Sequence, residues 1–353
     1  MNLLRELLKP LAESGVALSR EQAAEVVDEM LDGDVLEVET AALLAVLATR
    51  GEQAPELAGF VDAMRRRAKP LPFSDAERDQ LVDCVGTGGG GPQTFNISCG
   101  AALVAAAAGA SVAKHGNRAV TSRCGAADVL EALGVPIDLK PEVAVECLRE
   151  TGFVFLFAPL YHPAMKTLGP LRRALGFRTI FNLVGPLTNP AHARVQVIGV
   201  LAPSRVLLVG RTLAELGAKR AFVVHGSDGI DELTTTGESV VARIERAKAS
   251  EAELKVARIT PEMAGLPRTT LEHFIGGDVA TNKALLEEVL TGVHGARRDV
   301  VLLNAAAVLV AAGLAGDLKE GVAMGAEAID SGQAAATLEK LRRFGAKFSS
   351  KAS

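Results

Sequence analysis

The stretch LVDCVGTGGGG occupies residues 81–91 and joins a short apolar run to a cluster of glycines. LVDCV (81–85) has the length and composition of a buried β-strand, and five of the six residues after it are glycine. Glycine lets backbone N–H groups approach an anion closely, and the carboxyl end of a strand is where α/β proteins bind ligands. Ordering this loop has a large entropic cost. The stretch therefore predicts an α/β fold with an anion site at residues 86–91; a flexible surface turn is the alternative.

Short apolar segments alternate with helical ones downstream of this loop. The strand-like segments are SVAKHG (111–116), FVFLFA (153–158), RVQVIGVLA (194–202) and RAFVVHG (220–226). This alternation indicates a parallel or mixed sheet flanked by helices. We expect VGPLTNP (184–190) to be a turn-rich crossing, and DVVLLNAAAVLVAAG (299–313) to be followed by two helical segments that close the chain.

Residues upstream of the loop have a different periodicity. Apolar residues recur at helical spacing in four segments of residues 1–70, and Pro-Leu-Pro at 70–72 ends the pattern. We therefore predict a small helical domain over residues 1–72 and a larger α/β domain over residues 73–353, with a mostly parallel central sheet.

Composition excludes several functional classes. The 353 residues include 38 basic and 42 acidic side chains, a net charge of −4, so no basic excess indicates a nucleic-acid partner. The four cysteines are scattered without metal-binding spacing, which favours a reducing, cytoplasmic location. The N-terminus resembles an amphipathic helix rather than a secretory signal. The longest nearly apolar stretch (101–113) is shorter than the roughly 20 residues that span a bilayer.

Phosphate is the anion that the surroundings of the loop favour. The loop contains G-x-G-x-x-G, but no acidic residue follows the next strand, and no lysine follows the glycines as in a Walker motif. Two polar segments flank the site instead: the run Thr94, Asn96 and Ser98, and the basic turn 114–122. A ligand with phosphates at both ends would suit them. The alternative for Ser98 is a simple helix N-cap without a ligand, and the alternative for Lys114 and His115 is a solvent-exposed turn.

Acidic and basic residues elsewhere suggest a metal site and a carboxylate site. Asp228, Asp231 and Glu232 follow a strand and a glycine turn, which suits Mg²⁺, although acids at a helix start are the simpler explanation. Arg172 and Arg173 point about 100° apart on a helix, so one can bind a carboxylate in a cleft. Spacing alone does not say which one, and a solvated face is the alternative.

Eight segments in consistent order resemble anthranilate phosphoribosyltransferases. They are VGTGGGG (85–91), TFNIS (94–98), VAKHGNR (112–118), GAADVLEALGV (125–135), FLFAPLYHPAMK (155–166), LGFRTIFNLVGPLTNPA (175–191), VVHGSDGIDELT (223–234) and LLNAAAVL (302–309). The resemblance covers most of the chain, and the combination of segments is highly specific. It implies a fold similar to pyrimidine nucleoside phosphorylases, with a segment near 165–185 returning to the helical domain. It also implies a homodimer formed through that domain.

The implied reaction transfers the phosphoribosyl group of 5-phosphoribosyl 1-diphosphate to the amine of anthranilate, the second step of tryptophan biosynthesis from chorismate. Mg²⁺, with two ions per site, would bind the diphosphate through Ser98, Asp231 and Glu232. Anthranilate would contact Gly86, Asn117, His162 and Arg172, and the catalytic residues would be Lys114, Arg172 and His115. The phosphoribosyl diphosphate contacts would be Gly86, Gly89, Gly90, Thr94, Asn96, Ile97, Ser98, Cys99, Lys114, His115, Gly116, Asn117, Arg118, Thr121, Ser122 and Ala126.

Three positions depart from the family pattern. Gly90 stands where the family commonly has aspartate, Cys99 where it often has threonine, and Thr121-Ser122 replaces a Ser-Ser pair. Because the other motif residues are intact, we expect an active enzyme. The alternatives are a pyrimidine nucleoside phosphorylase-like enzyme, a non-catalytic nucleic-acid-binding paralogue and, on the glycine motif alone, a NAD(P) dehydrogenase.

Overall fold

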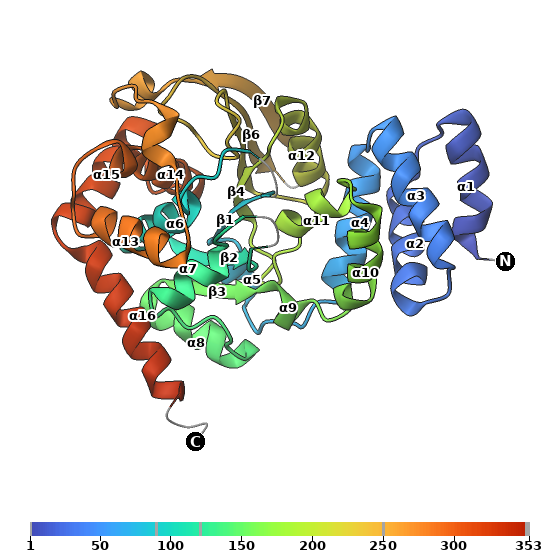
Figure 1. Ribbon diagram of the computed structural model, residues 1–353, viewed down its shortest axis with the longest axis horizontal. Coiled ribbons are helices and arrows are strands. Elements are labelled where there is room, and N and C mark those ends of the chain that lie inside the picture. Colours follow the sequence, from blue (N-terminus) through green and yellow to red (C-terminus); the bar gives the residue numbers. More distant parts are fainter. Residues whose placement is uncertain (1, 89–90, 120–121, 249–250, 350–353) are drawn as a thin grey trace.

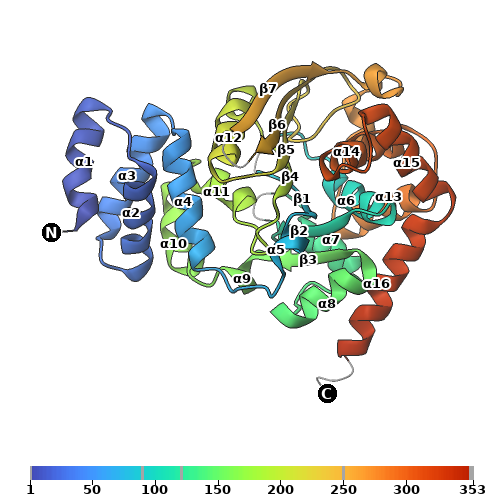
Figure 2. The ribbon, with the colours of Figure 1, turned by 180° about the vertical axis from the view of Figure 1, so that it is seen from behind.

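The computed structural model describes residues 2–88, 91–119, 122–248 and 251–349. A bundle of helices lies on one side of a large α/β body, as Figures 1 and 2 show from opposite directions. The bundle begins with α1 (Leu3–Ser14), α2 (Arg20–Asp32), α3 (Glu37–Arg50) and α4 (Ala54–Arg66). The short helix α5 (Asp75–Arg78) then leads into the sheet.

A seven-stranded sheet forms the centre of the α/β body, in the order β3-β2-β1-β4-β5-β6-β7. The first five strands in that order are parallel, and they are β3 (Phe153–Phe157), β2 (Ser111–Gly116), β1 (Leu81–Gly86), β4 (Val195–Gly199) and β5 (Arg220–Gly226). β6 (Ser239–Lys248) and β7 (Glu251–Ile259) extend the sheet antiparallel. The expected mostly parallel sheet is therefore confirmed. The antiparallel hairpin was not predicted, because charged residues such as Arg243 and Glu245 interrupt its apolar pattern.

Helices cover both faces of the sheet because the parallel strands are apolar on both faces. On one face lie α6 (Ile97–Ala107) and α14 (Ala296–Ala312), and on the other lies α12 (Pro203–Glu215). Along β4, Val195 and Val197 belong to the hydrophobic cluster of the first face, and Ile198 to that of the second. The remaining helices of the first side are α7 (Ala126–Ala132), α8 (Pro141–Thr151), α13 (Val279–Leu290), α15 (Leu318–Asp330) and α16 (Gln333–Ser349).

The core of the helical bundle continues into the second face of the sheet. After β3, the helices α9 (Ala158–Tyr161), α10 (Met165–Leu175) and α11 (Phe181–Leu187) run back towards the bundle, and Figure 1 shows α10 and α11 beside α4. Leu168 and Leu171 of α10 share one buried cluster with Leu43 of α3 and Val223 of β5. The bundle is thus joined to the sheet by continuous apolar packing.

Two further segments complete the fold. The 3-10 helices η1 (Pro261–Ala264) and η2 (Leu271–Phe274) connect β7 to α13. The expectation of a turn-rich crossing at 184–190 was wrong for residues 184–187, which form the end of α11. Val184 and Leu187 are buried there, and the Asn182 side chain accepts a hydrogen bond from the Thr179 N–H at the helix start. Within the described residues, no helix is both long and apolar enough to cross a bilayer.

Candidate functional site

The glycine loop at the end of β1 packs directly against Asp231. The Gly88 N–H donates a hydrogen bond of 2.9 Å to Asp231 Oδ2. A Cβ on Gly86 would lie 2.2 Å from the same oxygen, so only glycine lets the carboxylate reach the backbone. The Thr87 N–H donates to the Gly199 carbonyl at the end of β4. The structure therefore brings residues 86–88 and 231 together, while Gly89 and Gly90 lie outside the described residues.

The acids after β5 divide into one that stabilises a turn, Asp228, and an adjacent pair, Asp231 and Glu232. Asp228 accepts hydrogen bonds from the hydroxyls of Thr234 (2.6 Å) and Thr236 (2.8 Å), so its carboxylate stabilises the turn. Glu232 Oε2 is buried and has no hydrogen-bond partner among the described residues. Burial, together with the adjacent Asp231 charge, raises the pKa of Glu232 well above its usual range. Two neighbouring carboxylates in this setting favour a bound cation.

Lys114 connects the glycine strand to the start of α6. Its side chain is only 1% exposed. The ammonium donates hydrogen bonds to the Cys84 carbonyl of β1 and to Ser98 Oγ, which lies 3.3 Å away. Lys114 is therefore not the solvated side chain of a surface turn. It holds a buried positive charge behind the glycine loop, where it can attract an anion.

The first turn of α6 contributes backbone and side-chain polar groups. Its N-cap is Asn96, so Ser98 is not the capping residue, and the hydroxyl is free of that role. The Asn96 amide donates to the Cys124 carbonyl (3.3 Å) and accepts from Asn282 Nδ2 (2.9 Å). Ile97 and Cys99 are 0% exposed, so these two predicted contacts can offer only backbone groups to a ligand. Thr94 lies just before the helix and pairs with Ile275.

The basic turn after β2 is anchored on several sides. Arg118 forms ion pairs with Asp128 (3.0 Å) and Glu131 (2.8 Å), and Asn117 Oδ1 accepts a hydrogen bond from the Arg118 N–H. A Cβ on Gly116 would lie 2.9 Å from the Phe155 ring, so a glycine fits here. The other predicted residues of this turn are Ser122, which lies 3.5 Å from the Cys124 carbonyl, Ala126 at the start of α7, and Thr121, which is outside the described residues.

Two buried histidines face each other beside this turn. The rings of His115 and His162 have centroids 5.2 Å apart at an interplanar angle of 62°. Burial lowers the pKa of His115 to about 3 and that of His162 to about 4. Both imidazoles are therefore neutral at pH 7 and present an uncharged, aromatic wall.

Arg172 lies on α10 and faces inward. Its guanidinium carbon is 5.6 Å from the centroid of the Phe181 ring, and burial lowers its pKa. Within the described chain it forms no ion pair with an acid, whereas the adjacent Arg173 is exposed. A half-buried guanidinium without a carboxylate partner is suited to bind the carboxylate of a ligand.

Two polar residues that shape the site were not foreseen. Asp83, fully buried in β1, accepts a hydrogen bond of 3.0 Å from the His115 N–H, and burial raises its pKa to about 6. Asn189 donates to the Ala113 carbonyl at 2.7 Å. A lone acid inside the apolar run LVDCV was the available signal for Asp83, since a buried acid requires a partner.

Any metal here would depend on few protein ligands. In the part of the chain that the structure describes, no group of three or more histidine, cysteine, aspartate or glutamate side chains is arranged to hold a metal ion. Asp231 and Glu232 provide two carboxylates, and Ser98 provides a hydroxyl. Mg²⁺ commonly binds through one or two carboxylates together with phosphate oxygens of a substrate. The donor set therefore fits Mg²⁺ that arrives with a diphosphate.

Comparison with known proteins gives consistent matches along the chain. The model described as "Glycosyl transferase family, helical bundle domain" matches residues 5–68, and "Glycosyl transferase family, a/b domain" matches residues 78–335. The anthranilate phosphoribosyltransferase of Moorella thermoacetica is 48% identical over 93% of this chain and 94% of its own length. That of a Bradyrhizobium species is 49% identical over 97% and 98%.

Solved structures agree with these matches. The crystal structure of anthranilate phosphoribosyltransferase from Thermus thermophilus superposes with a TM-score of 0.88 at 43% identity, covering 98% of this chain and all of that one. The enzyme from Saccharomyces cerevisiae in complex with PRPP and Mg has a TM-score of 0.86 at 26% identity, covering 98% of both chains.

The fold and the phosphate-directed loop thus define a class: the chain belongs to the glycosyl transferase family whose members combine this helical bundle with this α/β domain. The sequence identity of 48–49% to these relatives, over almost the full length, narrows the assignment within the family. Within that family, the chain is one of the anthranilate phosphoribosyltransferases.

Proposed function

We propose that this chain transfers the phosphoribosyl group of 5-phosphoribosyl 1-diphosphate to the amine of anthranilate and releases diphosphate. The observation that carries the proposal is the convergence of Gly86–Gly88, Asp231, Lys114 and Ser98 at the ends of β1 and β2. Backbone amides, a buried ammonium and a carboxylate pair for a cation all act on the same kind of ligand, a diphosphate.

Substrate binding divides between the two parts of the molecule. The sugar diphosphate would contact the glycine loop, the start of α6 and the basic turn, including Gly89, Gly90 and Thr121. Anthranilate would lie between Asn117, the neutral imidazole of His162 and the inward-facing Arg172, whose guanidinium would bind the carboxylate. This arrangement would present the amine to C1 of the ribose.

The transfer exchanges one bond at C1 for another. The bond from C1 to the diphosphate oxygen breaks and the bond from C1 to nitrogen forms with inversion. The nitrogen then releases a proton to water or to His115. Mg²⁺, when bound through Ser98, Asp231 and Glu232, would neutralise charge on the departing diphosphate. Lys114 and the loop amides would stabilise that charge further, and Arg172 would fix the position of the nucleophile. Because His115 is buried and neutral, its role would be to shape the pocket or accept a proton.

The organisation of the active molecule is part of the proposal. We assign residues 1–72 and the returning segment near 165–185 to the helical domain, and the rest of the chain to the α/β domain. The packing of α10 on α2 and α3 supports this division. We further propose two Mg²⁺ ions per site and a homodimer formed through the helical domain. Exposed Leu36 and Val38 at the start of α3 are apolar side chains available for such a contact.

A fluorescence assay tests the activity directly. Anthranilate is fluorescent, and its signal should fall only when 5-phosphoribosyl 1-diphosphate and Mg²⁺ are both present. A phosphorylase would instead cleave pyrimidine nucleosides with inorganic phosphate and leave anthranilate unchanged. Nucleoside cleavage without anthranilate consumption would overturn the proposed substrate.

A further inference from the structure

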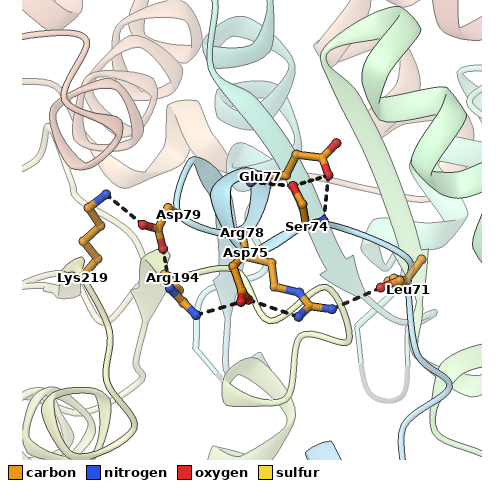
Figure 3. Close-up of polar contacts among 8 residues, drawn as sticks. All are labelled: Leu71, Ser74, Asp75, Glu77, Arg78, Asp79, Arg194 and Lys219. Atoms are coloured by element: carbon orange, nitrogen blue, oxygen red, sulfur yellow. Dashed lines mark hydrogen bonds and ion pairs between the residues drawn. The ribbon is translucent and has the colours of Figure 1, made fainter. Parts of the chain in front are cut away.

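A polar cavity lies at the end of the sheet where the parallel strands begin, opposite the glycine loop. Its volume is about 240 Å³, and its walls come from Arg65 of α4, Arg78 just before β1, residues 192–196 leading into β4, and residues 216–218 leading into β5. These segments precede the strands, whereas the glycine loop follows β1. None of the residues predicted for either substrate lines this cavity. Figure 3 shows part of its rim, where Arg78 and Arg194 meet acidic side chains.

The charge of the cavity wall is positive. Arg65, Arg78 and Arg194 line it, and no carboxylate is among the described lining residues. Asp75 and Asp79 pair with Arg78 and Arg194 only at the rim. Arg65 donates hydrogen bonds only to the Leu187 carbonyl (3.1 and 2.8 Å) and forms no ion pair within the described chain. Burial lowers the pKa of Arg65 to about 10, although the charge of Asp62 offsets part of this effect. A half-buried guanidinium without an ion-pair partner within the described chain favours an anionic ligand.

Two hydrogen-bond donors of the wall have no acceptor. Gln196 is 1% exposed, and its Nε2 has no partner among the described residues; the same holds for the buried Nε of Arg78. Buried polar groups are nearly always paired in folded proteins, and both of these atoms can only donate. A ligand rich in acceptor oxygens would satisfy them.

A carboxylate at the rim of the cavity already pairs with two of its arginines. Asp75 lies 3.5 Å from both Arg78 and Arg194, yet its side chain is 79% exposed. Ion pairs this long and this exposed are weak. Arg194 Nη1 also forms a closer ion pair with Asp79, at 2.5 Å, whereas its Nη2 faces Asp75. An incoming dianion can therefore displace Asp75 and pair with Arg78 and with Nη2 of Arg194.

We propose that this cavity binds a phosphate-type oxyanion. The anion would lie between Arg65 of the helical bundle and two arginines at the starts of β1 and β4, Arg78 and Arg194. Guanidinium groups bind such oxygens bidentately, which suits a wall built from three of them. The bound anion links α4 to the starts of β1 and β4. It therefore stabilises the joint between the bundle and the sheet and acts as a structural or regulatory ligand, not as a substrate.

Inorganic phosphate and three single substitutions test this site. Arg194→Gln removes one lining charge but keeps the backbone contacts of Arg194 with Arg78 and Lys219. Lys219→Gln is the matched control, because Lys219 pairs with Asp79 at 3.4 Å on the same rim without lining the cavity. Asp75→Asn removes the competing carboxylate. The readout is the phosphate dependence of the melting temperature at constant ionic strength, with chloride as reference.

We expect phosphate to stabilise the wild-type chain and Lys219→Gln alike. Arg194→Gln should weaken the affinity by about tenfold or more, the usual effect of losing a charged hydrogen bond. Asp75→Asn should strengthen it. Equal phosphate responses in Arg194→Gln and Lys219→Gln would overturn the proposal, as would an unchanged response in Asp75→Asn. If Arg194→Gln fails to fold, Asp75→Asn decides alone.

Two further measurements separate this site from the active site. Phosphate also competes with the sugar diphosphate at the glycine loop under the proposed function, and that inhibition should be the same in Arg194→Gln as in the wild type. In crystals soaked with phosphate, density between Arg65 and Arg194 supports the site, and density only at residues 86–98 contradicts it. Ribose 5-phosphate binding more tightly than phosphate would identify a phosphate ester as the ligand; equal binding would identify the free anion.

Discussion

The ammonium of Lys114 lies 3.3 Å from Ser98 Oγ, and this contact joins the second strand of the sheet to the first turn of α6. Lys114 also donates to the Cys84 carbonyl, so its position is set from two elements. The charge thus stands behind the glycine loop in a fixed place before any substrate binds. Preorganised charge of this kind is the main source of catalysis when an anion departs.

Replacing Lys114 with glutamine should remove this charge while keeping hydrogen-bond donors in the same place. We expect kcat to fall by about 10²- to 10³-fold, the size of effect seen when one group that stabilises transition-state charge is lost. Steady-state kinetics measure the loss, and circular dichroism checks that the variant is folded. Near wild-type turnover by a folded variant would refute the role of Lys114.

The adjacent arginines of α10 allow a matched comparison. Arg172→Ala should raise KM for anthranilate by about 10- to 100-fold, because a charged, bidentate contact to the carboxylate is lost. The KM for the sugar diphosphate should change little. Arg173→Ala removes the same charge from an exposed position and should leave both constants near their wild-type values. Similar effects of Arg172→Ala on both substrates would contradict the carboxylate role.

The acids after β5 give a second matched set. Asp231→Asn combined with Glu232→Gln should abolish Mg²⁺-dependent turnover, since both carboxylates of the proposed metal site are lost. Asp228→Asn should instead destabilise the turn by about 1–3 kcal/mol, because it weakens hydrogen bonds to two threonines. Its Mg²⁺ dependence should be retained. Activity measured across Mg²⁺ concentrations, with thermal unfolding alongside, distinguishes the two outcomes.

The buried histidines make stability depend on pH. His115 and His162 have folded pKa values of about 3 and about 4, below the unfolded value of about 6.5. The unfolded chain therefore binds more protons between these values, and stability is lost as pH falls below about 6.5. Each histidine should cost about 2 kcal/mol between pH 6.5 and pH 5.

Substituting His162 isolates its share of this effect. In His162→Asn, the free energy of unfolding should depend less steeply on pH between 5 and 6.5, by about one proton. Urea unfolding at several pH values provides the measurement. An identical slope in the variant would show that His162 is protonated in the folded protein.

The sequence predicted those helices and strands whose apolar residues recur with a clear period. LVDCV, SVAKHG and RAFVVHG are strands because their apolar residues are buried on both faces of a parallel sheet. The hairpin of β6 and β7 escaped prediction because one of its faces is charged. The end of α11 escaped it because glycine and proline at 185–186 indicated a turn, while burial of Val184 and Leu187 favoured a helix.

The candidate site, like the fold, could be predicted from the sequence only where the signal is local. The glycine loop was visible as a motif, but Gly88 and Asp231 are 143 residues apart, and only the folded chain shows their hydrogen bond. Spacing left the choice between Arg172 and Arg173 open, and the proposal for Arg172 rests on the resemblance and on its inward-facing guanidinium. No sequence pattern indicated the unpaired donors of Gln196 and Arg78. They suggest a ligand only because the folded chain buries them without an acceptor among the described residues.

Arg172 and the glycine loop belong to different bodies of the molecule. The arginine lies on α10, which packs on α2 and α3, while the loop ends a strand of the sheet. Under the proposed function, the gap between the nucleophile and the sugar would therefore depend on the angle between bundle and sheet. Substitutions far from either substrate can alter turnover by changing that angle. Variants where α4, α11 and α12 pack together would therefore change the reaction geometry without touching a substrate.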